Sequence, residues 1–339
     1  MTPTDDPRTA RTDAALLDGV LAPDGAVTEP ARGIAERFEL GRVREVVALP
    51  GAGRRNAAIL TDDGSWILRV GADVDTLRKE RFFADAIRTT TRLATPWPFD
   101  IDDAGDLLRY PYAVMPRLPG QTLWWAHEHD WAAVGEALAD AALELHRTAW
   151  PAAGEWDPAA DAIAADHRPA GVRCAARADE LKQQLDASGH SLDDQSSRWV
   201  DTLVAPARQS DEAGVACLVH GDFVIGNVGL TPAGRGWRVT GVFDLEAARV
   251  GEPEDDFIGH VWWACYGGRP EAAVAFLQRY RPDGAFSPRL RTYLVLRLLA
   301  NWEFGQRNHE PWYGHARTFS EWAGPIVDAV DRVLAAAYG

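Results

Sequence analysis

Short apolar runs bounded by Gly, Pro, Asn and Asp dominate the first third of the chain, and such runs are typical of strands. They cover residues 43–49, 57–60, 65–70, 99–101 and 107–115. One stretch breaks the pattern, because Leu77, Phe83 and Ile87 recur at helical spacing and predict a helix at 75–87. The order predicts a small β-rich lobe with one main helix.

Helical periodicity prevails in the rest of the chain. Helices are predicted at 131–147, 170–185, 198–208, 257–266, 271–280, 288–304 and 319–337, and two strands at 227–230 and 238–243. Residues 151–169, rich in Ala, Asp and Pro, show no clear pattern. We therefore predict an α+β fold of two lobes, the second mostly helical.

The Pro- and Gly-containing stretch at 115–120 interrupts both strand and helix patterns and marks the lobe boundary. The predicted parts are an N-terminal extension at 1–36 with short helices, a small lobe at 37–117 and a large lobe at 118–339. A length of 339 residues fits two lobes.

The charge of the chain indicates which classes of partner it is expected to bind. The 50 acidic and 35 basic residues give a net charge of −15, which argues against nucleic acid and anionic membranes because both attract positive fields. The charge is compatible with a cationic substrate, although a soluble protein also uses it to stay dispersed, and we prefer that plainer interpretation. Nothing in the sequence indicates an oligomeric state.

The cysteines and the apolar runs indicate the compartment. Cys174, Cys217 and Cys265 are odd in number and lack metal-binding or disulfide spacing, so they are expected to be buried in a reducing compartment. The N-terminus does not resemble a signal peptide, and no run of about eighteen apolar residues occurs. We expect a cytoplasmic protein.

Residues 218–246 carry the candidate chemistry. His220-Gly221-Asp222 is followed by Asn227, and the two strands that come next form a hairpin that ends at Asp244. The hairpin should return Asp244 close to Asn227. Carboxylate and amide oxygens suit Mg²⁺, and phosphoryl transfer needs one Asp for the attacking hydroxyl and oxygen ligands for the metal.

Several motifs together resemble the aminoglycoside phosphotransferase and choline kinase group. They are His220-Gly221-Asp222 with Asn227, Val242-Phe243-Asp244-Leu245-Glu246, and Gly251-Glu252-Pro253 with Asp256. The resemblance implies a protein-kinase-like bilobal fold and phosphorylation of a small molecule. Turns also attract Asp and Asn, but this spacing requires more than turn chemistry.

The resemblance implies a role for each residue of the motif. Asp222 would be the catalytic base, and Asn227 and Asp244 the Mg²⁺ ligands. His220 would support its loop, and Glu246 would touch the metal through water or be structural. Asp256 would brace the catalytic loop, with a helix N-cap as an alternative or additional role. Glu252 stands where family members often carry Asp, and His146 is interpreted as structural.

The nucleotide-binding residues are carried over in the same way. Gly51, Gly53 and Asn56 would lie over the phosphates of ATP or GTP. Arg69 replaces the usual Lys and would grip phosphate while Glu80 holds it; a surface Arg and a helix-surface acid are the alternatives. Backbone groups at Met115, Arg117 and Leu118 would bind adenine, or the stretch is a plain linker.

The acceptor is the open question. Trp302 beside acids such as Asp255 and Glu303 could hold a cation or a sugar face, although most Trp residues are expected in helical cores. The preferred function is ATP- or GTP-dependent phosphorylation of a hydroxyl on an aminoglycoside-like antibiotic. The alternatives are a metabolic choline, homoserine or sugar kinase and a non-catalytic nucleotide-binding regulator. A protein kinase is disfavoured because no Ala-Pro-Glu or activation segment follows Asp244.

Overall fold

A computed structural model describes the chain at residues 17, 19–22, 26–49, 56–71, 73–123, 127–209, 214–281, 290–308 and 314–339. The chain divides into two compact units. The first unit comprises Met1–Thr89, Ala94–Pro119 and Phe243–Glu246, and the second comprises Thr90–Leu93, Gly120–Val242 and Ala247–Gly339. A short segment from late in the sequence therefore belongs to the first unit.

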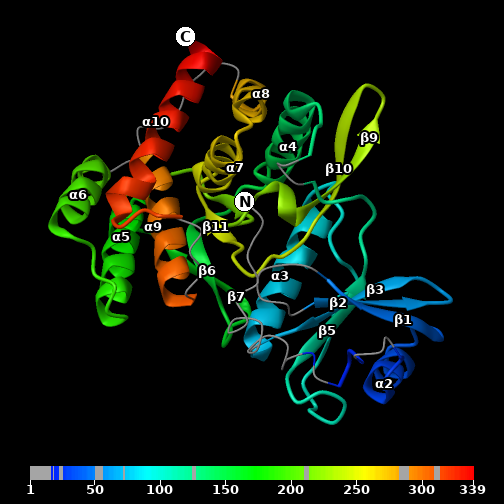
Figure 1. Cartoon of the computed structure of the whole chain (residues 1–339). Helices are drawn as coiled ribbons and strands as arrows, with labels where there is room; N and C mark the ends of the chain where they lie inside the picture. The colour runs from blue at the N-terminus through cyan, green and yellow to red at the C-terminus, as the bar shows by residue number, and fades with distance from the viewer. Residues whose placement is uncertain are drawn as a thin grey trace. The chain divides into compact units, whose positions relative to one another are not determined.

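The first unit is built on one antiparallel sheet. Its strand order is β1 (Val43–Ala48), β2 (Asn56–Thr61), β3 (Ser65–Val70), β5 (Tyr112–Pro116) and β4 (Asp100–Asp102). Two helices accompany it, α2 (Glu29–Arg37) and the longer α3 (Val74–Thr90), drawn in dark blue and cyan in Figure 1. These elements confirm the predicted β-rich region with one main helix.

Side chains along β3 alternate between the hydrophobic core and the face of the sheet that carries Arg69. Leu68 and Val70 are fully buried in the hydrophobic cluster that also contains Ile34 of α2. Because successive strand residues point to opposite faces, Arg69 lies on the other face of the sheet. There it meets Glu80 of α3.

The strand predicted at 107–115 is wrong in its first half, because β5 begins only at Tyr112. Pro111 has no N–H to donate to a neighbouring strand, although its carbonyl accepts from Gly71 N–H at 2.9 Å. Leu108 is buried in the core all the same. Its apolar character therefore reflects loop packing and not strand pairing.

The second unit is mostly helical, as predicted. Its helices are α4 (Trp131–Leu145), α5 (Ala170–Ala187), α6 (Asp194–Arg208), α7 (Glu254–Tyr266), α8 (Pro270–Tyr280), α9 (Leu290–Asn308) and α10 (Phe319–Tyr338). Helix α6 begins earlier than the predicted residue 198. The reason is Asp193, whose side chain accepts from the N–H groups of Gln195 and Ser196 and so caps the helix.

A four-stranded sheet in the second unit was not predicted as such. Its order is β7 (Ala162–Asp166), β6 (Ala153–Asp157), β11 (Arg249–Gly251) and β8 (Cys217–Val219). The β6–β7 hairpin lies in the Ala- and Asp-rich stretch, whose residues have low strand propensity. Pairing with β11, about ninety residues away in sequence, stabilises these strands and leaves no local signal.

The hairpin predicted before Asp244 is confirmed and is longer than expected. Strands β9 (Val228–Ala233) and β10 (Gly236–Val242) pair in antiparallel register from Gly236↔Ala233 to Val242↔Val228. Val228 follows Asn227 directly, and Val242 precedes Asp244 by two residues. The register therefore places Val228 opposite Val242, and each of these residues lies within two residues of a predicted metal ligand.

No helix among the described residues is both long enough and apolar enough to cross a membrane.

Candidate active site

The loop His220-Gly221-Asp222 follows β8, and a buried carboxylate binds its backbone. Asp256 of α7 accepts the backbone N–H of His220 at 2.6 Å and the backbone N–H of Gly221 at 2.7 Å. The alternative prediction that Asp256 caps α7 is wrong. It is the third residue of that helix, and Pro253 occupies the cap position.

Two further side chains stabilise the buried Asp256. His146, at the C-terminal end of α4, places Nε2 3.1 Å from Asp256 Oδ2, and its Nδ1 lies 2.8 Å from the Tyr280 hydroxyl. Burial acts to raise the pKa of Asp256, but the hydrogen bond and charge of His146, together with His220, hold that pKa below its ordinary value. The carboxylate therefore stays ionised and keeps the loop fixed.

The candidate catalytic carboxylate is oriented by Asn227. Asn227 Nδ2 donates to Asp222 Oδ2 at 2.8 Å and to the Asp222 carbonyl at 2.9 Å. The Asp222 N–H donates to His220 Nδ1 at 3.3 Å, so His220 lies within the loop it was predicted to support. Because Asn227 uses its NH₂ group on Asp222, its amide oxygen is the atom left for a cation.

Gly221 is required by the close approach of two chain segments. Its φ is +77°, in the left-handed region that favours glycine. A Cβ there would lie 2.0 Å from the carbonyl oxygen of Ala247. The loop can therefore pack against Ala247 only with glycine at this position.

In the first unit, one guanidinium serves three carboxylates. Arg69 Nε donates to Glu80 Oε1 at 2.6 Å, and Arg69 Nη2 lies 2.9 Å from both Asp244 Oδ1 and Glu246 Oε2. Arg69 and Glu80 are largely buried, whereas the Asp244 and Glu246 side chains are 37% and 50% exposed. The structure thus brings together four of the predicted site residues.

The electrostatics of this group favour an added cation. Burial raises the pKa of Glu80 to about 7, against the opposing charge of Arg69. Burial also acts to lower the pKa of Arg69, but the charges of Glu80, Asp244 and Glu246 keep it above its ordinary value. With one positive and three potential negative charges, the cluster carries an excess of carboxylate that Mg²⁺ would neutralise.

The donor chemistry fits Mg²⁺ without a complete protein cage. No group of three or more His, Cys, Asp and Glu in the described parts of the chain is arranged to hold a metal by itself. Mg²⁺ usually keeps several waters and binds one or two carboxylates together with substrate phosphates. The exposed Asp244 carboxylate and the amide oxygen of Asn227 are donors of that kind.

The remaining nucleotide candidates lie in or beside the sheet. Asn56 is opposite Arg69 in the β2–β3 pair, and its buried Oδ1 has no hydrogen-bond partner among the described residues. Met115 pairs with Ile67 inside β5, and the Arg117 N–H donates to the Ser65 carbonyl at 2.9 Å, so that N–H is occupied by the sheet. Leu118 follows the strand. Gly51 and Gly53 lie outside the described residues.

The three acceptor candidates are engaged within the protein. Asp255 forms ion pairs with Arg249 and with Arg297, the latter at 2.9 Å. Glu303 is buried and pairs with Arg307 at 2.9 Å. Trp302 is also buried, and its ring packs against Phe319 and Trp322. Their contacts are those of a helical core, which the sequence suggested for most Trp residues.

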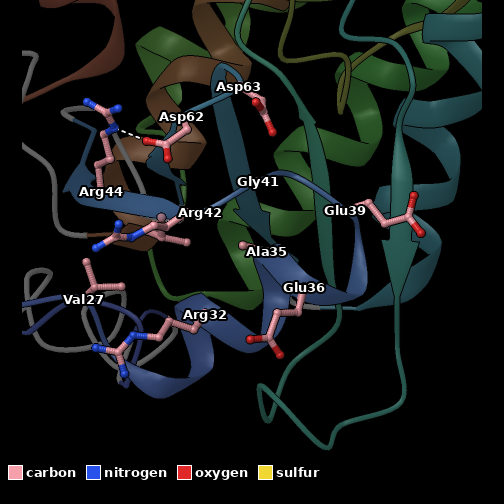
Figure 2. Close-up of a pocket in the computed structure, with 11 residues that line it drawn as sticks. Val27, Arg32, Ala35, Glu36, Glu39, Gly41, Arg42, Arg44, Asp62 and Asp63 are labelled. Carbon is pink, nitrogen blue, oxygen red and sulfur yellow. Dashed lines mark hydrogen bonds and ion pairs between the residues drawn. The ribbon is translucent and has the colours of Figure 1, made fainter.

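The first unit also contains a cavity that is lined by other residues than the predicted site. It measures about 940 Å³ and is lined by α2, the chain leading to β1 and the β2–β3 turn. Figure 2 shows Arg32, Arg42 and Arg44 around it, with Arg44 ion-paired to Asp62. None of the predicted site residues lines this cavity, so we do not assign the chemistry to it.

The chain is similar to known proteins over most of its length. The model of the phosphotransferase enzyme family matches residues 45–293. Hygromycin-B 4-O-kinase of Escherichia coli is 26% identical over 284 residues, which cover 80% of this chain and 77% of that protein. Residues 45–293, which the family model matches, contain the motifs around Asp222, Asp244 and Asp256.

Solved structures show the same fold. A thermostable mutant of aminoglycoside phosphotransferase APH(4)-Ia, in ternary complex with ADP and hygromycin B, superposes with a TM-score of 0.66 at 22% identity and covers 91% of this chain and 99% of its own. The GDP complex of wild-type aminoglycoside 2'-phosphotransferase-IIIa superposes with a TM-score of 0.57 at 16% identity, covering 90% and 97%. These likenesses confirm the predicted kinase-like α+β fold.

Proposed function

Because this chain belongs to the phosphotransferase enzyme family, we propose that it transfers the γ-phosphoryl group of ATP or GTP to a hydroxyl of an aminoglycoside-like antibiotic. The observation that carries the proposal is the Asp222 carboxylate, held by Asn227 on a loop that Asp256 fixes. A carboxylate placed in this way can orient an acceptor hydroxyl and take its proton.

Two observations support the substrate class. The similar Escherichia coli protein is named for phosphorylating hygromycin B, and a similar solved structure holds that antibiotic together with ADP. The net charge of −15 also suits an amine-bearing, cationic acceptor. A choline, homoserine or sugar acceptor is the alternative, because substrate choice lies in the pocket and not in the fold.

Asp222 would act on the acceptor. The hydroxyl oxygen forms a bond to the γ-phosphorus as the bond from that phosphorus to the bridging oxygen of the nucleoside diphosphate breaks. The hydroxyl proton passes to the Asp222 carboxylate late in the transfer. Most of the acceleration would come from position and charge, since the transition state is loose and needs little help from a strong base.

Asn227 and Asp244 would hold Mg²⁺, and Glu246 would lie beside it. When bound, Mg²⁺ neutralises charge on the phosphate oxygens. Asp244 would then exchange its ion pair with Arg69 for the metal, which would leave one N–H of Arg69 Nη2 for a phosphate oxygen while Glu246 keeps its contact with the same nitrogen. Glu80 would keep Arg69 in place during the exchange, because it binds Nε and not Nη2.

The nucleotide would contact the sheet of the first unit. Gly51, Gly53 and Asn56 would cover the phosphates. Met115 and Leu118 would offer backbone groups to the base. The Arg117 N–H is occupied by Ser65, so at Arg117 only the carbonyl would serve this purpose.

A panel assay tests the proposal. Purified protein with Mg²⁺ and either ATP or GTP is mixed with hygromycin B, kanamycin, choline, homoserine or a sugar, and phosphorylated product is detected by mass spectrometry. We expect product with at least one aminoglycoside and none from Asp222→Ala. Product with only a metabolite would overturn the substrate class. Nucleotide binding without any product, unchanged in Asp222→Ala, would indicate a non-catalytic regulator.

A further inference from the structure

We propose that Arg249 is a positioning residue that fixes the Asp222-bearing loop by holding the Ala247 carbonyl against Gly221. The effect of Arg249 on the loop follows from the geometry of the second unit alone. The effect of Arg249 on catalysis rests on the function proposed above. Neither the motifs nor the family resemblance pointed to this arginine.

Arg249 lies directly beside the loop. It belongs to β11 and pairs with Val219 of β8, the residue that precedes His220. Its Nη1 donates to the Ala247 carbonyl oxygen at 3.0 Å. A Cβ built at Gly221 would lie 2.0 Å from that oxygen and 2.9 Å from Arg249 Nη1. The Ala247 carbonyl and the Arg249 guanidinium therefore both pack closely against the loop at Gly221.

The guanidinium is itself anchored. Asp255 of α7 forms an ion pair with Arg249 through Nη2. Arg297 of α9 donates to the same carboxylate at 2.9 Å and approaches the Asp255 carbonyl at 3.4 Å. The Asp255 and Arg297 side chains are only 13% and 14% exposed, so water screens this contact little. Charged hydrogen bonds of this kind hold geometry well.

Two adjacent residues of α7 thus act on one loop. Asp256 accepts the N–H groups of His220 and Gly221 directly. Asp255 acts through Arg249 on the Ala247 carbonyl that faces Gly221. Loss of Arg249 would leave that carbonyl without its donor and give the loop room to shift. A displacement near 1 Å at a catalytic group can cost about 100-fold in rate.

Amide hydrogen exchange tests the structural part on the ligand-free protein. Arg249→Met keeps the side-chain stem and removes every donor. We expect peptides covering residues 218–223 to exchange roughly tenfold faster, since local opening becomes easier. Asp255→Asn should act in the same direction, and adding it to Arg249→Met should change little more, because both lie on one chain of contacts. Arg249→Lys should restore part of the protection.

Kinetics tests the catalytic consequence on the same proteins. We expect Arg249→Met to lower kcat by about 10- to 100-fold and to leave KM for the nucleotide within about twofold. A merely structural residue would instead lower thermal stability without separating kcat from KM. Arg208→Met is the matched control, because it breaks the exposed ion pair of Arg208 with Asp179 in the same unit and should leave both readouts unchanged.

The outcomes separate this inference from the proposed function. Wild-type exchange at 218–223 in folded Arg249→Met, or an equal change in Arg208→Met, would overturn the role of Arg249. Faster exchange in a protein that phosphorylates no acceptor would support the role of Arg249 and refute the proposed function. Should Arg249→Met not fold, Arg249→Lys and Asp255→Asn carry the same comparison.

Discussion

Asn227 Nδ2 lies 2.8 Å from Asp222 Oδ2, so the predicted metal ligand also orients the predicted base. Its second hydrogen bond, to the Asp222 carbonyl at 2.9 Å, locks the amide in one orientation. One side chain therefore links two functions, and its removal should disturb both.

We predict that Asn227→Ala lowers kcat by roughly 100-fold and raises the Mg²⁺ concentration needed for half-maximal rate at least tenfold. The first effect follows from the loss of the Asp222 partner, and the second from the loss of an oxygen ligand, for which changes of about 10- to 100-fold are typical. Initial rates over a Mg²⁺ titration measure both. Gln184→Ala on the exposed side of α5 is the control. An unchanged Mg²⁺ requirement would contradict the assignment of Asn227 as a ligand.

Asp256→Asn should destabilise the fold by about 2–4 kcal/mol, because an NH₂ group would face a backbone N–H with no acceptor between them. Asp193→Asn is a matched control, since Asp193 also accepts two backbone N–H groups but lies at an exposed helix cap where Asn serves as well. Urea unfolding at neutral pH compares the two variants. Equal losses would show that burial of Asp256 does not matter.

The Asp256 carboxylate should also make the stability of the fold depend on pH in the acid range. Its pKa in the folded protein is below the ordinary value of 3.8, so ionised Asp256 stabilises the fold above that pH. The stabilisation is lost as the pH falls below about 4, because the unfolded chain takes up the proton first. Unfolding free energies of the wild type and Asp256→Asn should therefore converge in that range. A gap that stays constant down to pH 3 would contradict this prediction.

Glu80 should have the opposite pH dependence. Burial raises its pKa from 4.5 to about 7, so the folded protein holds this proton more tightly than the unfolded chain does. Stability contributed by the protonated form is complete below pH 4.5 and is lost as the pH rises towards 7. Between pH 5 and 8 the wild type should lose roughly 2–3 kcal/mol more than Glu80→Gln.

Urea unfolding at the two pH values measures that difference. Glu36→Gln on the exposed face of α2 serves as the control and should keep the wild-type dependence. Parallel curves for Glu80→Gln and the wild type would show that Arg69 holds Glu80 ionised throughout. Saturating Mg²⁺ without nucleotide should flatten the wild-type curve, because added positive charge favours the ionised carboxylate.

Gly221→Ala should abolish activity and cost more than 3 kcal/mol, because the new Cβ would meet the Ala247 carbonyl at 2.0 Å in addition to the left-handed backbone. Gly189→Ala separates the two costs. Gly189 has a φ of +79° with no atom within 4 Å of a built Cβ, so it should lose only about 1 kcal/mol. Thermal unfolding and turnover measured on both variants would contradict the close contact if the losses were equal.

Local patterns in the sequence predicted most elements of the fold correctly. Helical periodicity located each α-helix described in the second unit but not the short 3-10 helix at Ile225–Asn227, and apolar runs located the strands described in the first unit. The errors in the strands arise from tertiary contacts. The β6–β7 hairpin and β11 are short and poor in strand-forming residues, and they exist because distant segments pair with them. Leu108 gave a strand signal because a loop is buried.

The motif spacing alone determined which residues were candidates for the chemistry. Asp222, Asn227 and Asp244 stand at intervals that a loop and a hairpin impose, and such intervals depend on only a few neighbouring residues. The pairing of Arg69 with Glu80, eleven residues apart, came instead from the family resemblance, and the structure shows that contact. Spacing of this kind is readable without any knowledge of the rest of the chain.

Only the tertiary structure decided which side chains support those candidates. His146 meets Asp256 across 110 residues, and Arg69 meets Glu246 across 177. Arg249 became relevant only when its guanidinium was found between Asp255 and Ala247. Contacts at such separations depend on how whole helices and strands pack, and a pattern that repeats every two or four residues contains no information about that packing.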